Sequence, residues 1–318
     1  MKRFDLSVVG ELNADLILYG LPQTLEPERE HLASNFAITL GSSSAIFAHN
    51  ISSLGSRVGF TSCIGDDSLG NFCVERLRES GVDVSGVKTL ADKTTGVTVI
   101  LPFAKQRQIL TYLGTTLHLQ FAHLDPNYLR SASHFHLSSF FLLRGLRPRI
   151  PELFSQMKLS GLTTSLDTND DPEGLWGDDV KAVLKSVDIF LPNEREACKL
   201  TGASEVQDAL EALSRLVPIV VIKCGPKGVI AKRGKNEFHV PSLSVQPVDT
   251  VGAGDSFNAG FLHKFILRSN LEECLEYGNA VAALSTTRAG GTEALRDRSH
   301  RESFLQGVNV RHSLPESQ

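Results

Sequence analysis

The residues best suited to chemistry lie in the segment Asp249–Phe257, which leads from a turn into a helical pattern. Phe257, Phe261 and Phe265 recur at helical spacing and form one apolar face, so a helix is predicted to begin just before them. A helix N-terminus carries free N–H groups and the positive end of the helix dipole, which together favour anions. A carboxylate such as Asp255 would repel a phosphate there unless it takes a proton from a hydroxyl. The segment therefore predicts a base, Asp255, beside amides that stabilise developing negative charge.

A plainer interpretation is a tight turn in which Asp255 caps the helix. The wider pattern Asp-Thr-x-Gly-Ala-Gly-Asp-x-Phe is more specific than an arbitrary Gly-x-Gly-Asp. It resembles the signature of the ribokinase-like (PfkB) family of carbohydrate kinases, and the resemblance extends over roughly residues 4–307.

The resemblance implies roles for the residues of this segment. Asp255 would be the catalytic base, Thr250 would lie at the nucleotide, and the anion hole would be formed by the amides of Gly252, Ala253 and Gly254. In many members, carbonyls around Asp249, Val251 and the stretch 288–291 also hold a monovalent cation. Side chains do not reveal a carbonyl site, so the sequence leaves K⁺ open.

The resemblance also implies a sugar-binding set near the ends of predicted strands. In the family, the Asp of an Asn-x-Asp contacts sugar hydroxyls, which assigns Asp15 with Asn13 beside it, although a polar turn explains both equally well from the sequence alone. Their place after the strand at 4–10 is where open α/β sheets bind ligands. The remaining members of the set are Gly41, Ser42, Ser43 and Asn169.

Two residues depart from the family on this side of the site. The family pattern is Gly-Gly followed four residues later by Asn, whereas this chain has Gly41-Ser42 and then Ile46. Isoleucine offers a hydroxyl neither a donor nor an acceptor, so ribose is expected to be a poor substrate. Asp170 and Asp171 stand where some members carry an Arg, which argues weakly against an acidic sugar.

The nucleotide side is predicted from three further patterns. Asn193-x-x-Glu196 matches a family motif that helps to hold Mg²⁺, and it also reads as a helix capping arrangement; the two roles can coexist. The strand ending at Lys223 leads into a turn with Gly225 and Gly228, where glycines allow close approach of phosphates and Lys223 could reach one. Asn279 matches a position near the adenine in relatives.

The elements that must position these residues alternate along the chain. Strands are predicted at 4–10, 35–41, 57–63, 133–138, 162–167, 187–192 and 217–223, and helices at 42–54, 148–160, 178–186, 194–201, 204–216 and 271–288. This alternation predicts an α/β fold with a doubly wound, mostly parallel sheet. A single kinase domain, 1–318, is expected, with a small β lid from about 11–40 and 94–116. His134 and His136 have the spacing of a metal pair, but without a third ligand they are assigned to strand packing.

Composition narrows the class of protein. The chain of 318 residues has a net charge of −4 and no block of like charge, which gives no support for nucleic-acid or anionic-membrane binding. No run approaches the ~18 apolar residues of a membrane span, and the start lacks the apolar core of a signal peptide. Five scattered cysteines predict reduced thiols and a cytoplasmic protein. A homodimer through the lid is left open.

The sequence therefore predicts an ATP- and Mg²⁺-dependent kinase that phosphorylates a primary hydroxyl of a sugar. A nucleoside kinase of the same family and a non-catalytic sugar-sensing relative are the alternatives. A dinucleotide-dependent dehydrogenase is excluded because no Gly-x-Gly-x-x-Gly follows the first strand.

Overall fold

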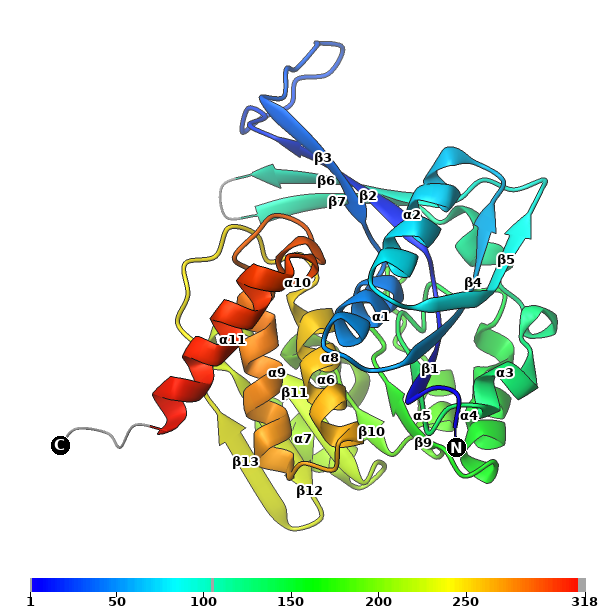
Figure 1. Cartoon of the computed structure of the whole chain (residues 1–318), viewed down its shortest axis with the longest axis vertical. Helices are drawn as coiled ribbons and strands as arrows, with labels where there is room; N and C mark the ends of the chain where they lie inside the picture. Colours follow the sequence, from blue (N-terminus) through cyan, green and yellow to red (C-terminus); the bar gives the residue numbers. More distant parts are fainter. Residues whose placement is uncertain (1, 104–105, 314–318) are drawn as a thin grey trace.

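A nine-stranded sheet forms the centre of the molecule (Figure 1). The computed structural model describes residues 2–103 and 106–313. The strand order is β13-β12-β11-β10-β9-β8-β1-β4-β5. All neighbours from β11 to β5 are parallel, and β12 and β13 add an antiparallel hairpin at one edge. The strands are β1 Leu6–Val9, β4 Val58–Gly65, β5 Asp83–Leu90, β8 His134–Leu137, β9 Thr163–Leu166, β10 Ile189–Phe190, β11 Ile219–Lys223, β12 Val229–Arg233 and β13 Asn236–Val240.

Helices cover both faces of this sheet, because alternate residues of each buried strand point to opposite faces. In β11, Val220 and Ile222 join the apolar cluster under α4, α5 and α7, whereas Val221 joins the cluster under α1, α8 and α9. The predicted doubly wound fold is confirmed. The helices are α1 Ser43–Ser53, α2 Ser68–Glu79, α3 Pro126–Arg130, α4 Ile150–Leu159, α5 Asp178–Leu184, α6 Glu194–Thr201, α7 Val206–Ser214, α8 Ala253–Ile266, α9 Leu271–Ser285, α10 Glu293–Arg296 and α11 Arg298–Ser313.

A second sheet of four strands stands apart from the first, in the order β3-β2-β6-β7. Its strands are β2 Asn13–Tyr19, β3 Asn35–Leu40, β6 Gly96–Phe103 and β7 Gln106–Tyr112. Figure 1 shows it projecting from one end of the molecule, far from the N-terminus. These strands fall within the segments expected to form a lid; that they close over a substrate stays a prediction.

The structure differs from the predicted elements in a few places. Strand β2 begins at Asn13, so Asn13 and Asp15 lie within a strand of the small sheet and not in a polar turn. The strand expected at 187–192 is only two residues long, and the helix expected to reach residue 288 ends at Ser285. Strand β5 was not anticipated, because its alternation is weak and much of it is exposed.

The structure also describes the histidines, the cysteines and the apolarity of the helices. The rings of His134 and His136 bridge hydroxyls of Thr163, Ser165 and Ser138 at 2.7–2.8 Å, so both histidines belong to the strand packing. The five cysteines are free. Among the helices of the described ranges, none combines the length and apolarity that crossing a bilayer requires.

Candidate active site

The first turn of α8 forms the centre of the candidate site. Gly252 precedes the helix with φ 70°, a conformation that favours glycine. A side chain there would meet Gly291 and Ile46, because an added Cβ would lie 2.8 Å from Gly291 Cα. Within the described ranges, the N–H groups of Gly252 and Gly254 have no hydrogen-bond acceptor, whereas the N–H of Ala253 donates to the carbonyl of Thr250 at 3.3 Å. Two of the three predicted anion-hole amides are thus free to bind an anion.

Asp255 lies at this turn with its side chain largely buried. Burial, followed by the negative charge of Asp167, raises the pKa of Asp255 to about 7, against the lowering effect of Lys223. The nearby hydroxyl of Ser43 also lowers the pKa of this carboxyl. A carboxylate with a pKa in this range can accept a proton near neutral pH and release it again.

A second buried carboxylate, Asp15, reaches the same region from β2. Burial, and then the charges of Asp255 and Asp249, raises its pKa to about 7. Gly41 packs directly on it, since a Cβ added to Gly41 would lie 2.0 Å from Asp15 Oδ1. Asp15 belongs to the small sheet and Asp255 to helix α8. The two carboxylates nevertheless lie close enough for the charge of Asp255 to act on Asp15.

Hydrogen bonds join the other expected sugar-binding residues. The Oγ of Ser42 accepts the backbone N–H of Asn13 at 2.8 Å. The Nδ2 of Asn169 donates to Ser43 Oγ at 2.8 Å, and its Oδ1 accepts the N–H of Ser139 at 2.9 Å. Asn13 and Asp15 lie in β2, Gly41 and Ser42 connect β3 to α1, which begins at Ser43, and Asn169 follows β9. These hydrogen bonds, with the packing of Gly41 on Asp15, bring the six predicted residues together.

Ile46 is buried against the loops that form the anion hole. An added Cβ on Gly252 would lie 3.1 Å from Ile46 Cγ2, and one on Gly291 would lie 2.6 Å from Ile46 Cδ1. Its side chain therefore fills the space behind these glycines. Whether a sugar also meets it stays a prediction.

Glu196 and Asn193 form the capping box expected for the start of α6. Glu196 Oε2 accepts the N–H of Asn193 at 2.9 Å, and Asn193 Oδ1 accepts the N–H of Glu196 at 2.9 Å. Burial, and then the charge of Asp167, raises the pKa of Glu196. No group of three or more His, Cys, Asp or Glu with metal-site geometry occurs in the parts described. Glu196 is the carboxylate that the sequence assigns to Mg²⁺, an ion that keeps most of its waters.

Lys223 meets an acid that the sequence did not single out. Its Nζ donates to Asp167 Oδ2 at 2.5 Å and to Asn258 Oδ1 at 3.3 Å. Burial lowers the pKa of Lys223, but the charges of Asp167 and Glu196 outweigh this and raise it. The same ammonium lies beside the anion hole, 3.6 Å from the position of a Cβ added to Gly254.

The remaining nucleotide-side residues have structural partners. Asn279 donates to the carbonyls of Val240 and Pro241 at 3.2 and 2.9 Å and so holds the end of β13 on α9. A Cβ added to Gly228 would lie 2.1 Å from the Val240 carbonyl oxygen, whereas Gly225 faces open space. Thr250 is exposed. Any contact of these residues with a nucleotide stays a prediction.

Five polar residues that complete the site were given no role from the sequence: Glu11, Ser44, Ser139, Asp167 and Asn258. Glu11 accepts hydroxyl hydrogen bonds from Ser44 and Ser139 at 2.8 and 2.6 Å, and Asp167 pairs with Asn258 and Lys223. Ser139 and Asp167 closely follow parallel strands, so the rule that ligands bind at carboxyl ends of strands would have found them.

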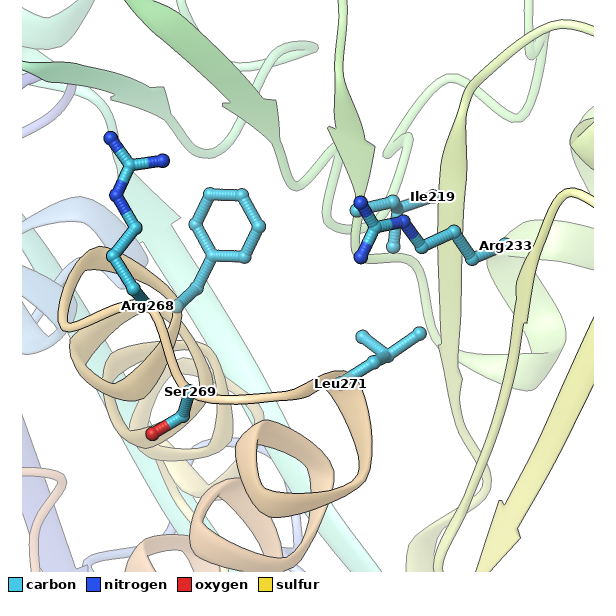
Figure 2. Close-up of a pocket in the computed structure, with 6 residues that line it drawn as sticks. Ile219, Arg233, Arg268, Ser269 and Leu271 are labelled. Atoms are coloured by element: carbon cyan, nitrogen blue, oxygen red, sulfur yellow. The ribbon is translucent and has the colours of Figure 1, made fainter.

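A surface cavity of about 210 Å³ lies at the opposite edge of the large sheet. Figure 2 shows Arg233, Arg268 and Leu271 around it, where β11 begins and α8 ends. It is smaller than the roughly 300–1,000 Å³ of most small-molecule sites. The cavity is separate from the carboxylates and amides described above.

Comparison with known proteins agrees with this geometry. The model of the family described as pfkB family carbohydrate kinase matches residues 3–298. A ribokinase from Haemophilus influenzae is 30% identical over 96% of this chain and 99% of its own. An aminoimidazole riboside kinase from Salmonella typhimurium is 29% identical over 98% of this chain and 96% of its own.

Solved structures share the fold. A ribokinase from Arabidopsis thaliana, complexed with ribose and ATP, has a TM-score of 0.81 at 25% identity and covers 95% of this chain and 99% of its own. A candidate ribokinase II from E. coli, in complex with ATP and Mg²⁺, has a TM-score of 0.83 at 26% identity, over 96% of this chain and 99% of its own.

The two glycines of the turn after β11 should differ in their tolerance of alanine. Gly225→Ala should lower the free energy of unfolding by about 1–2 kcal/mol, the cost of a left-handed conformation for an L residue. Gly228→Ala should lower it further, because the new Cβ collides with a backbone carbonyl. Thermal unfolding of both variants measures the difference. Equal losses would contradict the assignment of Gly228 to the junction with β13.

Proposed function

The chain belongs to the PfkB family of carbohydrate kinases and is an ATP-dependent sugar kinase, and we propose that it phosphorylates a primary hydroxyl with Asp255 as the base. The observation that carries this proposal is the buried Asp255 carboxyl, whose pKa is about 7, in the first turn of a helix with free amides. A pure anion-binding site has no use for a carboxylate at that position.

The proposed reaction uses residues of this chain in two roles. Asp255 takes the proton of the hydroxyl, the hydroxyl oxygen forms a bond to the γ-phosphorus of ATP, and the bond from that phosphorus to the β-phosphate oxygen breaks, releasing ADP. The amides of Gly252 and Gly254 stabilise the oxygens of the transferring group. Ala253 contributes once its weak bond to Thr250 opens.

ATP and Mg²⁺ are bound by the E. coli relative, and the residues described here fit both. Lys223, Gly225, Thr250 and Asn279 would face the nucleotide, and Glu196 with Asn193 would hold the ion through its waters. Bound Mg²⁺ supplies positive charge that neutralises the phosphates during transfer. The buried Glu196 carboxyl also caps α6, so its orientation is set before any ion binds.

The small sheet is proposed to be a lid and a dimer contact. Thr39 and Thr98 lie in register with Asp15 on one face of the sheet, so this face is polar next to Asp15. Its other face exposes Phe36, Ile38, Leu110 and Tyr112, which are 62%, 44%, 57% and 57% exposed. An apolar face of this kind favours burial against a second copy of the chain.

The five free cysteines support the proposal that the protein is cytoplasmic, where thiols stay reduced.

Potassium stays a separate proposal. It is supported by two hydrogen bonds, because Asp249 accepts the N–H groups of Val251 and Gly290 at 2.9 Å each. These bonds hold together the loop around Asp249 and the stretch 288–291, whose carbonyls are the candidate ligands. One candidate, the Gly291 carbonyl, already accepts a hydrogen bond from Asn50 at 2.9 Å.

A nucleoside kinase is the second candidate, because the Salmonella relative acts on a riboside. A non-catalytic sensor is disfavoured by the intact base and amides. ATP consumption against a panel of sugars and nucleosides distinguishes these functions.

Ribose should be a poor substrate, since Ile46 offers its hydroxyls no hydrogen-bond partner. A kcat/KM for ribose of about 10⁴ M⁻¹s⁻¹ or better would contradict that expectation.

Asp255→Asn should remove most turnover while nucleotide affinity is kept, because proton removal typically contributes about 10²–10⁴-fold. In the parent, kcat/KM should rise as pH increases through about 7, since only the deprotonated carboxylate accepts a proton and burial with Asp167, Glu11 and Asp15 nearby keeps its pKa high. The variant should lose this acid limb. Turnover within about threefold of the parent would rule out Asp255 as the base.

Glu196→Gln separates the two roles of this residue, because glutamine can also complete a capping box. The melting temperature should therefore stay near that of the parent, while the Mg²⁺ concentration for half-maximal rate rises. A lower melting temperature with an unchanged magnesium titration would show that Glu196 only caps the helix.

A further inference from the structure

A buried ion pair joins three elements behind the anion hole. The side chains of Asp167 and Lys223 are only 1% and 13% exposed, and their charged atoms are 2.5 Å apart. Asn258, in α8, donates to the same Asp167 oxygen at 2.5 Å and accepts from the ammonium at 3.3 Å. Asp167 follows β9, and Lys223 ends β11, so the three side chains lock two strand ends to the helix that carries Asp255.

Stability alone does not explain this pair. A buried ion pair is often no more stabilising than apolar side chains of similar volume, because both charges lose their hydration. The Asp167–Lys223 pair lies in a region that already buries the carboxylates of Glu11, Asp15, Glu196 and Asp255. The negative charge of Asp167 in this region raises the pKa values of Asp255 and Glu196. We therefore expect the Asp167–Lys223 pair to have a functional role.

The hydrogen bonds of Lys223 leave one donor unused. An ammonium group has three N–H donors, and in the described structure Asp167 and Asn258 accept two of them. The ammonium lies next to Gly254, whose amide is free. Asp167 meanwhile accepts the N–H of Asn169 at 3.2 Å through its other oxygen, so the same carboxylate also fixes the loop assigned to the sugar.

We propose that Asp167 is a positioning residue for phosphoryl transfer: with Asn258, it holds the Lys223 ammonium beside Gly254 in the first turn of α8, where negative charge develops on the transferring group. This inference rests on the proposed function. A lysine side chain is long and flexible, and its charge stabilises a transition state most when it is fixed in advance. Asp167 supplies that fixation and also couples the ammonium to the segment of Asn169.

The decisive variant neutralises both charges. Asp167→Asn alone leaves a buried ammonium unpaired and should lower both the melting temperature and kcat. Asp167→Asn combined with Lys223→Met removes both charges at nearly constant volume, so the melting temperature should return toward that of the parent. Under the proposal, kcat of this double variant stays low, on the order of 10²-fold below the parent, while KM for the sugar changes by less than about threefold.

A matched control is the ion pair between Lys158 and Asp188, at 2.9 Å, which lies at the other edge of the sheet. The double variant Asp188→Asn/Lys158→Met should keep kcat within about threefold of the parent. If kcat recovers together with the melting temperature in the Asp167/Lys223 double variant, the pair is structural and the proposal is overturned.

Asn258→Ala provides a second measurement should the double variant fail to fold. It leaves the ion pair in place but removes one of the two acceptors that orient the ammonium, so kcat should fall by about 3–30-fold with little change in KM for the sugar. An unchanged kcat would overturn the proposal. Failure of the proposed function looks different: the parent would phosphorylate no sugar or nucleoside, or Asp255→Asn would remain active.

Discussion

Buried negative charge is the constraint on which the rest of this site depends. Glu11, Asp15, Asp167, Glu196 and Asp255 are all largely buried at one edge of the large sheet. Burial disfavours the ionised forms of Asp15, Glu196 and Asp255, and the negative charges of neighbouring carboxylates add to the effect. Among the described residues, Lys223 is the buried ammonium that faces them. The pKa values of Asp15 and Asp255 are consequently about 7, so the free protein holds its candidate base close to the midpoint of its titration near neutral pH.

The parallel sheet explains why these groups meet. The carboxyl ends of parallel strands lie at one edge, so a polar residue that follows any of them reaches the same region. That regularity made the fold predictable, and it explains why Asn169, Asn193 and Lys223, which each follow or end a strand, lie in the candidate site. Asp255 was found in another way, because it follows a glycine turn with a recognisable pattern. The cap formed by Asn193 and Glu196 was also readable, because a capping box is a local motif.

Contacts between distant segments could not be read in the same way. The pairing of Asp167 with Lys223 and Asn258 joins residues separated by 56 and 91 positions, and no local spacing marks it. The roles of Gly228 and Asn279 depend on where the end of β13 lies, since both contact Val240 or its neighbour. Glycine and asparagine beside a phosphate-binding pattern invite a ligand explanation, whereas here each also has a partner within the protein.

The two departures from the family pattern at the start of α1 differ in physical kind. Ser42 replaces a glycine but keeps φ at 68°, which costs a non-glycine residue about 1–2 kcal/mol. Its hydroxyl accepts the N–H of Asn13 and so offsets part of that cost while tying β2 to α1. The backbone conformation is therefore retained although the residue has changed. Ile46 instead alters the surface behind the anion hole, because its side chain packs on Gly252 and Gly291. The position of the free amides therefore depends on the packing of Ile46 as well as on the conformation of Gly252. Through this packing, helix α1, which begins at the sugar-binding loop, supports the anion hole and the base that lies beside it.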